Sequence, residues 1–195
     1  MSFDLNLILD SLPKMLAGFG VTLQLLVVSG LLGLILAILL LLMRLSGKFY
    51  LDWVAQVYIY IFRGTPILVQ IFIIYYGLPQ FEAIRDSIFW SILREPTGCA
   101  ILALTLNTGA YVSEILRAGV LGVDKGLLEA GSALGMSARQ KFIYITAPLA
   151  TRLALPAYSN DVISLLKSTA LASTITITDM TGIARTIVAD TYAPY

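Results

Sequence analysis

The stretch MLAGFGVTLQLLVVSGLLGLILAILLLLM, residues 15–43, decides the fold. It contains no charged side chain between Lys14 and Arg44, and it is longer than the ~20 apolar residues that a helix needs to cross a bilayer. Two more charge-free stretches follow, residues 64–81 and 96–113. We therefore expect an integral membrane protein whose spans are α-helices.

Composition supports this expectation and excludes several classes of enzyme. Hydrophobic residues make up 58% of the chain and charged residues 13%, whereas a typical soluble domain carries about 25% charged residues. The net charge of +1 gives no reason to expect a nucleic acid as partner. Cys99 is the only cysteine and histidine is absent, which excludes an internal disulfide, a Cys/His zinc site and a histidine-based triad. We expect no catalytic residue, no metal site and no cofactor.

Four stretches are apolar enough to form the spans of an all-α helical bundle. They are residues 19–43, 67–78, about 97–116, and an irregular stretch that follows Phe142. Pro66 interrupts a helical pattern that begins near Trp53, so we expect a kink or a helix start at this proline. The chain reaches Tyr195 without another full apolar run. Either the protein has four spans, or the sequence stops before the last one.

The first span carries three small residues at intervals of four: Ser29, Gly33 and Ala37. Small residues at this spacing allow another helix to approach closely. The alternative is that Ser29 and Gly33 face lipid, since glycine is common in membrane helices.

Positive charge marks the cytoplasmic segments. Arg44 and Lys48 follow the first span, and four more basic residues lie between the third and fourth: Arg117, Lys125, Arg139 and Lys141. Residues 79–96 carry two basic and three acidic side chains. By the positive-inside rule, residues 44–52 and 117–141 are cytoplasmic, and the N-terminus and residues 79–96 are external.

A short amphipathic helix is predicted in the second cytoplasmic segment. Its apolar face consists of Leu127, Leu128, Ala130, Leu134 and Met136. Gly131 and Gly135 leave room for close packing, and Gly135 suits the C-terminal end of the helix. Ser137 and Gln140 have the spacing of a capping box, which begins the next helix. The segment should form a compact knob of two short helices that cross at a glycine.

Six residues in and after this segment form a pattern: Glu129-Ala130-Gly131, Gly135, Ile145 and Pro148. The pattern resembles the EAA loop of bacterial ABC importer permeases, which prefers alanine at Gly131 and Leu-Pro at Ala147-Pro148. In that family the loop is a coupling helix that docks in a groove of the ATPase subunit. The resemblance implies that Glu129, Ala130, Gly131 and Gly135 couple this chain to an ATPase.

Longer strings extend the resemblance over nearly the whole chain. They are Arg63-Gly64-Thr65-Pro66 with Gln70, Gly109-Ala110-Tyr111, Ser113-Glu114, Arg117-Ala118-Gly119, Leu155 to Asp161 and Ser168 to Ser173. These strings are similar to those of the polar amino-acid family, in its histidine, arginine, lysine, ornithine and opine branch.

The resemblance implies one permease domain over residues 1–195, with the coupling-helix loop at about 124–141. It implies a bacterial inner-membrane location and transport of cationic amino acids or opines such as octopine and nopaline. The implied partners are an ATPase subunit dimer, a second permease subunit and an extracytoplasmic solute-binding protein. Permeases of this group usually have five spans, which implies a final helix beyond Tyr195.

Polar residues in the fourth span are candidates for the substrate pathway. Asp161 can pair with a cationic side chain and Asn160 can hold the amino-acid backbone. The alternative is a structural salt bridge of Asp161 with Arg152 or Lys167. Thr65 and Gln70 are weaker pathway candidates, for which helix packing is the competing interpretation.

Arg63 and Glu114 lie near span ends, and we expect them to form an ion pair that sets helix positions. The alternative is that both charges extend to the membrane interface.

One rival function remains at this stage, an ion-coupled amino-acid carrier or channel that works without an ATPase. The chain has no Gly-x-x-x-x-Gly-Lys-Ser/Thr string for nucleotide phosphates. The energy source of an ABC system must therefore be a separate polypeptide. The predicted helix over residues 125–136 distinguishes the two functions, because a carrier has no need of a docking knob.

Overall fold

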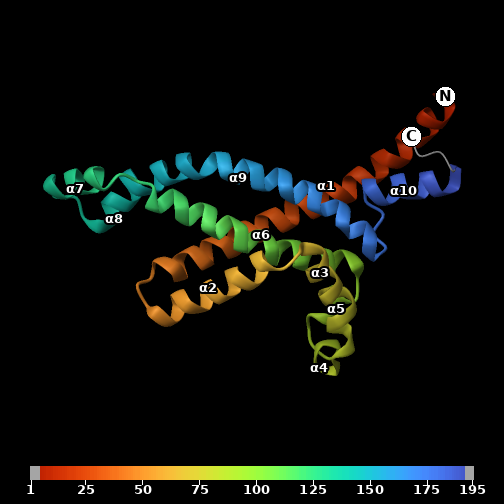
Figure 1. Ribbon diagram of the computed structural model, residues 1–195, viewed down its shortest axis with the longest axis horizontal. Helices are drawn as coiled ribbons and strands as arrows, with labels where there is room; N and C mark the ends of the chain where they lie inside the picture. Colours follow the sequence, from red (N-terminus) through yellow and green to blue (C-terminus); the bar gives the residue numbers. More distant parts are fainter. Residues whose placement is uncertain (1–4, 192–195) are drawn as a thin grey trace. The chain divides into compact units, whose positions relative to one another are not determined.

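The computed structural model describes residues 5–191, and this part of the chain is all-helical. Its α-helices are α1 (Leu5–Leu45), α2 (Phe49–Gly64), α3 (Ile67–Phe72), α4 (Glu82–Arg85), α5 (Trp90–Leu93), α6 (Pro96–Leu121), α7 (Lys125–Ala133), α8 (Ala138–Lys141), α9 (Ala147–Thr169) and α10 (Met180–Thr191) (Figure 1). Single π-helical turns cover Ile73–Gly77 and Phe142–Thr146, and 3₁₀ turns cover Leu78–Gln80 and Ala170–Ile175.

Two described helices are long and apolar enough to cross a membrane, namely the Ser11–Leu45 part of α1 and the whole of α6. A third span exists if Phe49–Gly64 and Ile67–Gln80 are counted as one broken span. The first helix begins at Leu5, well before the predicted start at residue 19. The fourth predicted span corresponds to α9, which has sufficient length but is not among these candidates.

The buried side of α1 is the side that carries the small residues. Ser29 and Ala37 are fully buried and Gly33 is buried as well. The opposite side exposes large apolar side chains, among them Leu31, Ile35 and Leu39. The close-packing interpretation of the small residues is thus confirmed, and the lipid-facing alternative for Ser29 and Gly33 is wrong.

The chain forms two compact units. Among the described residues, the first contains residues 5–31, 65–105 and 164–191, and the second contains residues 32–64 and 106–163.

In the first unit, the N-terminal part of α1 packs against α10 (Figure 1). The hydroxyl oxygen of Thr22 accepts a hydrogen bond of 3.2 Å from the backbone N–H of Met180. A Cβ atom at Gly18 would lie 2.9 Å from the same backbone nitrogen, so only glycine allows this approach. The carboxylate of Asp179, 1% exposed, caps α10 by accepting a 2.9 Å hydrogen bond from the N–H of Gly182.

The predicted external loop over residues 79–96 belongs to this unit and contains the short helices α4 and α5. The thiol of Cys99 donates a hydrogen bond of 3.1 Å to the backbone carbonyl of Leu93. A Cβ atom at Gly98 would clash with the carbonyl oxygen of Ile92. These contacts hold α5 directly against the first turn of α6.

The second unit is built around the C-terminal part of α1. Leu40 of α1 forms a buried cluster with Ala55 and Ile59 of α2. On the same face of α1, one turn before Leu40, a Cβ atom at Gly109 of α6 would lie 2.7 Å from the side chain of Leu36. Both α2 and α6 therefore pack closely on the same helix.

The predicted break at Pro66 is confirmed. Helix α2 ends at Gly64 and α3 begins at Ile67, with extended backbone at Pro66. Proline has no N–H, so the carbonyl of Phe62 loses its normal helical partner. The side-chain amide of Asn107, on α6, donates to that carbonyl at 3.2 Å instead.

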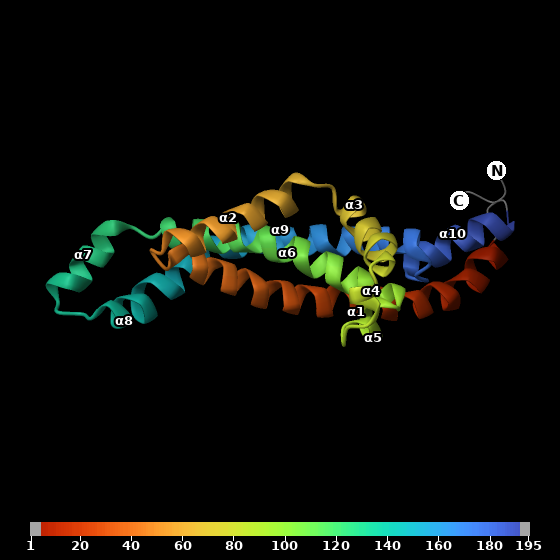
Figure 2. The same ribbon diagram turned by 90° about the horizontal axis from the view of Figure 1, so that it is seen from below.

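The predicted knob of two short helices is also present, as α7 and α8 at the far end of the α6–α9 hairpin (Figures 1 and 2). Asp124 caps α7 by accepting from the N–H of Gly126 at 2.7 Å. Gly135 ends this segment with φ of +76°, a conformation that favours glycine. Ser137 and Gln140 form the predicted capping box at the start of α8.

Candidate functional site

A pocket of about 500 Å³ lies in the second unit, where α2, α6 and α9 meet. The pocket is open because several of the residues that line it on α6 and α9 are small. They include Ala118, Gly119, Gly122 and Ala157. Gly119 also sets the spacing of the two helices, since a Cβ atom there would lie 2.6 Å from the carbonyl oxygen of Ala150. The volume is within the range of small-molecule sites.

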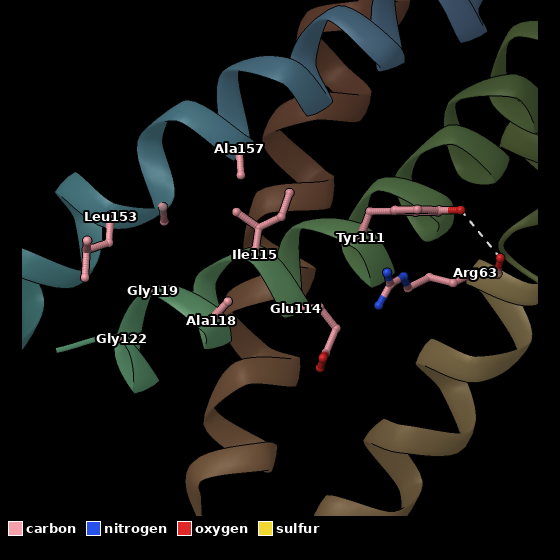
Figure 3. A pocket seen from close by; sticks show the side chains of 10 residues that line it. Arg63, Tyr111, Glu114, Ile115, Ala118, Gly119, Gly122, Leu153 and Ala157 are labelled. Carbon is pink, nitrogen blue, oxygen red and sulfur yellow. Dashed lines mark hydrogen bonds between the residues drawn. The ribbon is translucent and has the colours of Figure 1, made fainter.

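Three polar side chains face this pocket: Arg63 from α2, and Tyr111 and Glu114 from α6 (Figure 3). The guanidinium carbon of Arg63 lies 5.1 Å from the centre of the Tyr111 ring, which is a cation–π arrangement. The hydroxyl of Tyr111 donates to the backbone carbonyl of Arg63 at 3.5 Å. A second pocket, of about 510 Å³, shares these three residues and extends to Arg44 and Gln56.

The expected ion pair of Arg63 with Glu114 is not formed. Glu114 instead accepts a hydrogen bond of 2.8 Å from Arg44 of α1, and its other oxygen lies 3.9 Å from Arg117. Arg44 also pairs with Asp52 at the start of α2. The side chain of Arg44 is only 11% exposed, so this arginine fixes α1, α2 and α6 to one another by two ion pairs.

Asn160 and Asp161 lie on α9, where Asn160 is exposed and Asp161 is half-buried. Neither lines the two pockets. Asp161 follows the pocket-lining Ala157 by four residues, which places it on the same face of the helix, one turn further along. Over the described range 5–191, no salt bridge joins Asp161 to Arg152 or Lys167.

Thr65 and Gln70 are brought together by the break at Pro66. The side-chain amide of Gln70 donates to the hydroxyl of Thr65 at 2.8 Å and to its carbonyl at 3.0 Å. Gln70 is 6% exposed, and neither residue lines the two pockets. This geometry favours the structural interpretation, in which Gln70 completes the hydrogen bonding of the broken backbone.

The four residues predicted to couple to an ATPase lie together on and after α7. Glu129 and Ala130 are exposed, whereas Gly131 is buried. A Cβ atom at Gly131 would lie 2.9 Å from Ile145 and 3.3 Å from Lys141, so the two short helices do pack at this glycine. Leu134, next to Gly135, is 83% exposed and presents an apolar surface.

Sequence reasoning missed the roles of Arg44, Tyr111 and Gly119. The sequence marks Arg44 only as a basic residue of the predicted cytoplasmic side, because its partner on α6 is 70 residues away. The sequence signal for Tyr111 was its spacing of four residues, one helical turn, from Asn107. In the structure both residues bond to the end of α2. The small residues at 118, 119 and 122 similarly indicated a closely packed face.

The family model for the inner membrane component of binding-protein-dependent transport systems matches residues 11–193. The nopaline transport system permease protein NocM of Agrobacterium fabrum is 49% identical over 98% of this chain and 80% of the relative. The histidine/lysine/arginine/ornithine transport system permease protein HisM of Escherichia coli K12 is 42% identical over 91% of this chain and 75% of the relative.

A solved structure of an amino acid ABC transporter with histidines matches with a TM-score of 0.87 and 33% identity, covering 100% of this chain and 87% of that chain. The MetNI methionine ABC transporter, at 20% identity and a TM-score of 0.62, shares the fold. The family match and the similarity to ABC transporter permeases show that the chain is a membrane-embedded transport subunit whose ATPase is a separate component. The chain belongs to the family of inner membrane components of binding-protein-dependent ABC transport systems.

Proposed function

We propose that this chain forms the translocation pathway of an ABC importer for opines or cationic amino acids. The observation that carries the proposal is the identity of 49% and 48% with nopaline and octopine permeases, over 98% and 100% of this chain. The similarity to the HisM permease points to the same class of cargo. These substrates share a cationic group, a guanidinium, an ammonium or an imidazolium, attached to an amino-acid backbone.

The chemistry of α9 supports a cationic cargo. Asp161 is half-buried and has no salt bridge to Arg152 or Lys167 within the described residues. A carboxylate at membrane depth is costly unless a cation meets it, and such residues usually mark a substrate path. Asp161 would meet the cationic group and Asn160 the amino-acid backbone. Thr65 and Gln70 would contribute indirectly, because the hydrogen bonds between them stabilise the helix break at Pro66.

The coupling role and the topology follow from the same proposal. Helix α9 would be a fourth span. Its polar face would line the pathway, and for this reason the helix is less apolar than the other spans. The α7–α8 knob would then be cytoplasmic, with Glu129, Ala130, Gly131 and Gly135 docking on one subunit of an ATPase dimer. A second permease subunit would complete the pathway, and a solute-binding protein would deliver cargo from outside.

The rival function, an ATPase-independent carrier or channel, gains no support. A carrier needs no capped cytoplasmic element, whereas α7 and α8 are capped at both N-termini and packed through Gly131. The family match is to a binding-protein-dependent transport system, and the similar solved structure is that of an amino acid ABC transporter.

Uptake by an Asp161→Asn variant tests the cargo proposal. In proteoliposomes with the ATPase, partner permease and binding protein, the wild type should take up arginine or octopine only when ATP is present. The variant should lose cationic uptake far more than glutamine uptake, since only a cation gains from the carboxylate. Each substrate is supplied at saturating binding protein, so that delivery is equal.

The salt-bridge account predicts a different result. Uptake of both substrates would then fall together, thermal stability would drop, and neutralising Arg152 or Lys167 as well would restore function. Equal losses followed by such rescue would remove Asp161 from the pathway.

A further inference from the structure

Arg63 is the charged residue of the pocket whose charge is least compensated. Of the arginines around the pocket, Arg44 pairs with Asp52 and Glu114, and Arg117 lies near Glu114. Across residues 5–191, no carboxylate lies within ion-pair distance of Arg63. Its contact is with the ring of Tyr111, which attracts the cation but does not neutralise it.

Arg63 also lies in the middle of the candidate broken span that Phe49–Gly64 and Ile67–Gln80 form together, further from its ends than the sequence alone predicts. Asp52 marks the cytoplasmic end of α2 through its ion pair with Arg44, the residue that directly follows the first apolar run. Arg63 lies eleven residues further along the same helix, a rise of roughly 16 Å at 1.5 Å per residue. This is about half of a hydrocarbon core of ~30 Å. An arginine at this depth faces a cavity or a partner, because lipid contact is costly.

The cavity that Arg63 faces is the pocket of about 500 Å³ between α2, α6 and α9 (Figure 3). Tyr111 holds the guanidinium by its ring and holds the backbone of Arg63 by its hydroxyl, so the side chain is positioned before any ligand arrives. A planar guanidinium with free donors suits a carboxylate, which it binds with two parallel hydrogen bonds.

We infer that Arg63 is the anchor for the α-carboxylate of the transported amino acid or opine. The inference rests on the proposed function and adds the recognition of the anionic end of the same substrate. The cationic end would point toward α9, where Asp161 lies one turn beyond the pocket-lining Ala157. The pathway would thus bind both ends of a zwitterionic or cationic amino acid. A simple organic cation without a carboxylate would bind poorly.

Binding of arginine and agmatine separates this role from others, because agmatine is arginine without its carboxylate. The complete permease–ATPase complex in nanodiscs, without binding protein, is titrated with each compound by calorimetry. Hydrogen bonds to charged groups contribute about 1.5–3 kcal/mol, so wild-type complex should bind arginine about 10- to 100-fold more tightly than agmatine. Arg63→Gln should reduce this ratio to about one, and it should leave agmatine binding unchanged or stronger.

Two further variants test whether Arg63→Gln acts only by disturbing the structure. Arg63→Lys keeps the positive charge and should retain part of the preference, although it loses the bidentate geometry. Arg85→Gln removes an exposed arginine of α4, far along the chain from the pocket residues, and should keep the full preference. The thermal midpoint of every variant is measured in the same preparation.

Several results would overturn the inference. They are an unchanged arginine preference in Arg63→Gln, a parallel loss of both ligands together with a lower thermal midpoint, or equal binding of the two compounds by the wild type. Failure of the proposed function shows itself separately, as the absence of ATP-dependent uptake of any cationic substrate by wild-type protein with its binding protein.

Discussion

Replacement of Gly119 by alanine should loosen the contact between α6 and α9. The new Cβ atom would lie 2.6 Å from the carbonyl oxygen of Ala150 and 3.1 Å from the Cβ atom of Ala154. The first contact is with backbone, so no side-chain rotation can relieve it and the two helices must separate. Overpacking of this kind costs typically ~1–3 kcal/mol. Because the same glycine lines the pocket, the separation should also distort the proposed pathway.

The thermal midpoint of the purified complex measures this effect. For a chain of 150–250 residues, about 1 kcal/mol shifts the midpoint by ~2–4 °C, so Gly119→Ala should lower it by roughly 2–12 °C. Gly20→Ala on α1 is the matched control, because no atom lies within 4 Å of its new Cβ and the midpoint should not fall. A wild-type midpoint in Gly119→Ala would show that α6 and α9 are not in close contact at this position.

Three other changes test separate features. Arg44→Ala should destabilise the complex by about 3 kcal/mol or more, because it leaves the carboxylate of Glu114 largely unpaired, and a thermal midpoint equal to wild type would contradict the ion-pair network. Gly135→Leu should abolish transport and leave the protein in the membrane, since φ there is +76°; retained ATPase co-purification and retained stimulation by the binding protein would contradict the coupling role. In a Cys99→Ala background, Lys125→Cys should react with impermeant thiol reagents only from the cytoplasmic side, and labelling of intact cells would contradict the topology.

Features that depend on a few neighbouring residues could be predicted from the sequence. The break at Pro66 follows from a missing N–H, and the capping box of Ser137 and Gln140 follows from their spacing. Gly135 ends the α7 segment because glycine readily adopts the positive φ that the chain has there. Each of these features is decided within one helical turn, which is the range over which sequence patterns are informative.

Features that depend on tertiary contacts could not be predicted in this way. The expected pairing of Arg63 with Glu114 was wrong because Arg44, 70 residues earlier in the chain, takes the carboxylate. Sequence spacing contains no information on which of two basic helix ends will reach a given acid. The start of α1 at Leu5 was also not anticipated, because hydropathy marks apolar length and the helix continues beyond it. The pathway roles of Asn160 and Asp161 stay predictions.

The hydrogen bonds between α2 and α6 restrict how this protein can change conformation. The hydroxyl of Tyr58 donates to the carbonyl of Leu106 at 2.7 Å, and the amide of Asn107 donates to that of Phe62 at 3.2 Å. Pulling the two helices apart would take the acceptor from the Tyr58 hydroxyl and the Asn107 donor from the carbonyl of Phe62, and a lost hydrogen bond is costly inside a membrane. We therefore expect α2 and the part of α6 bonded to it to move as one rigid body during the transport cycle. The change between inward-open and outward-open states would then come from hinges in other parts of the protein.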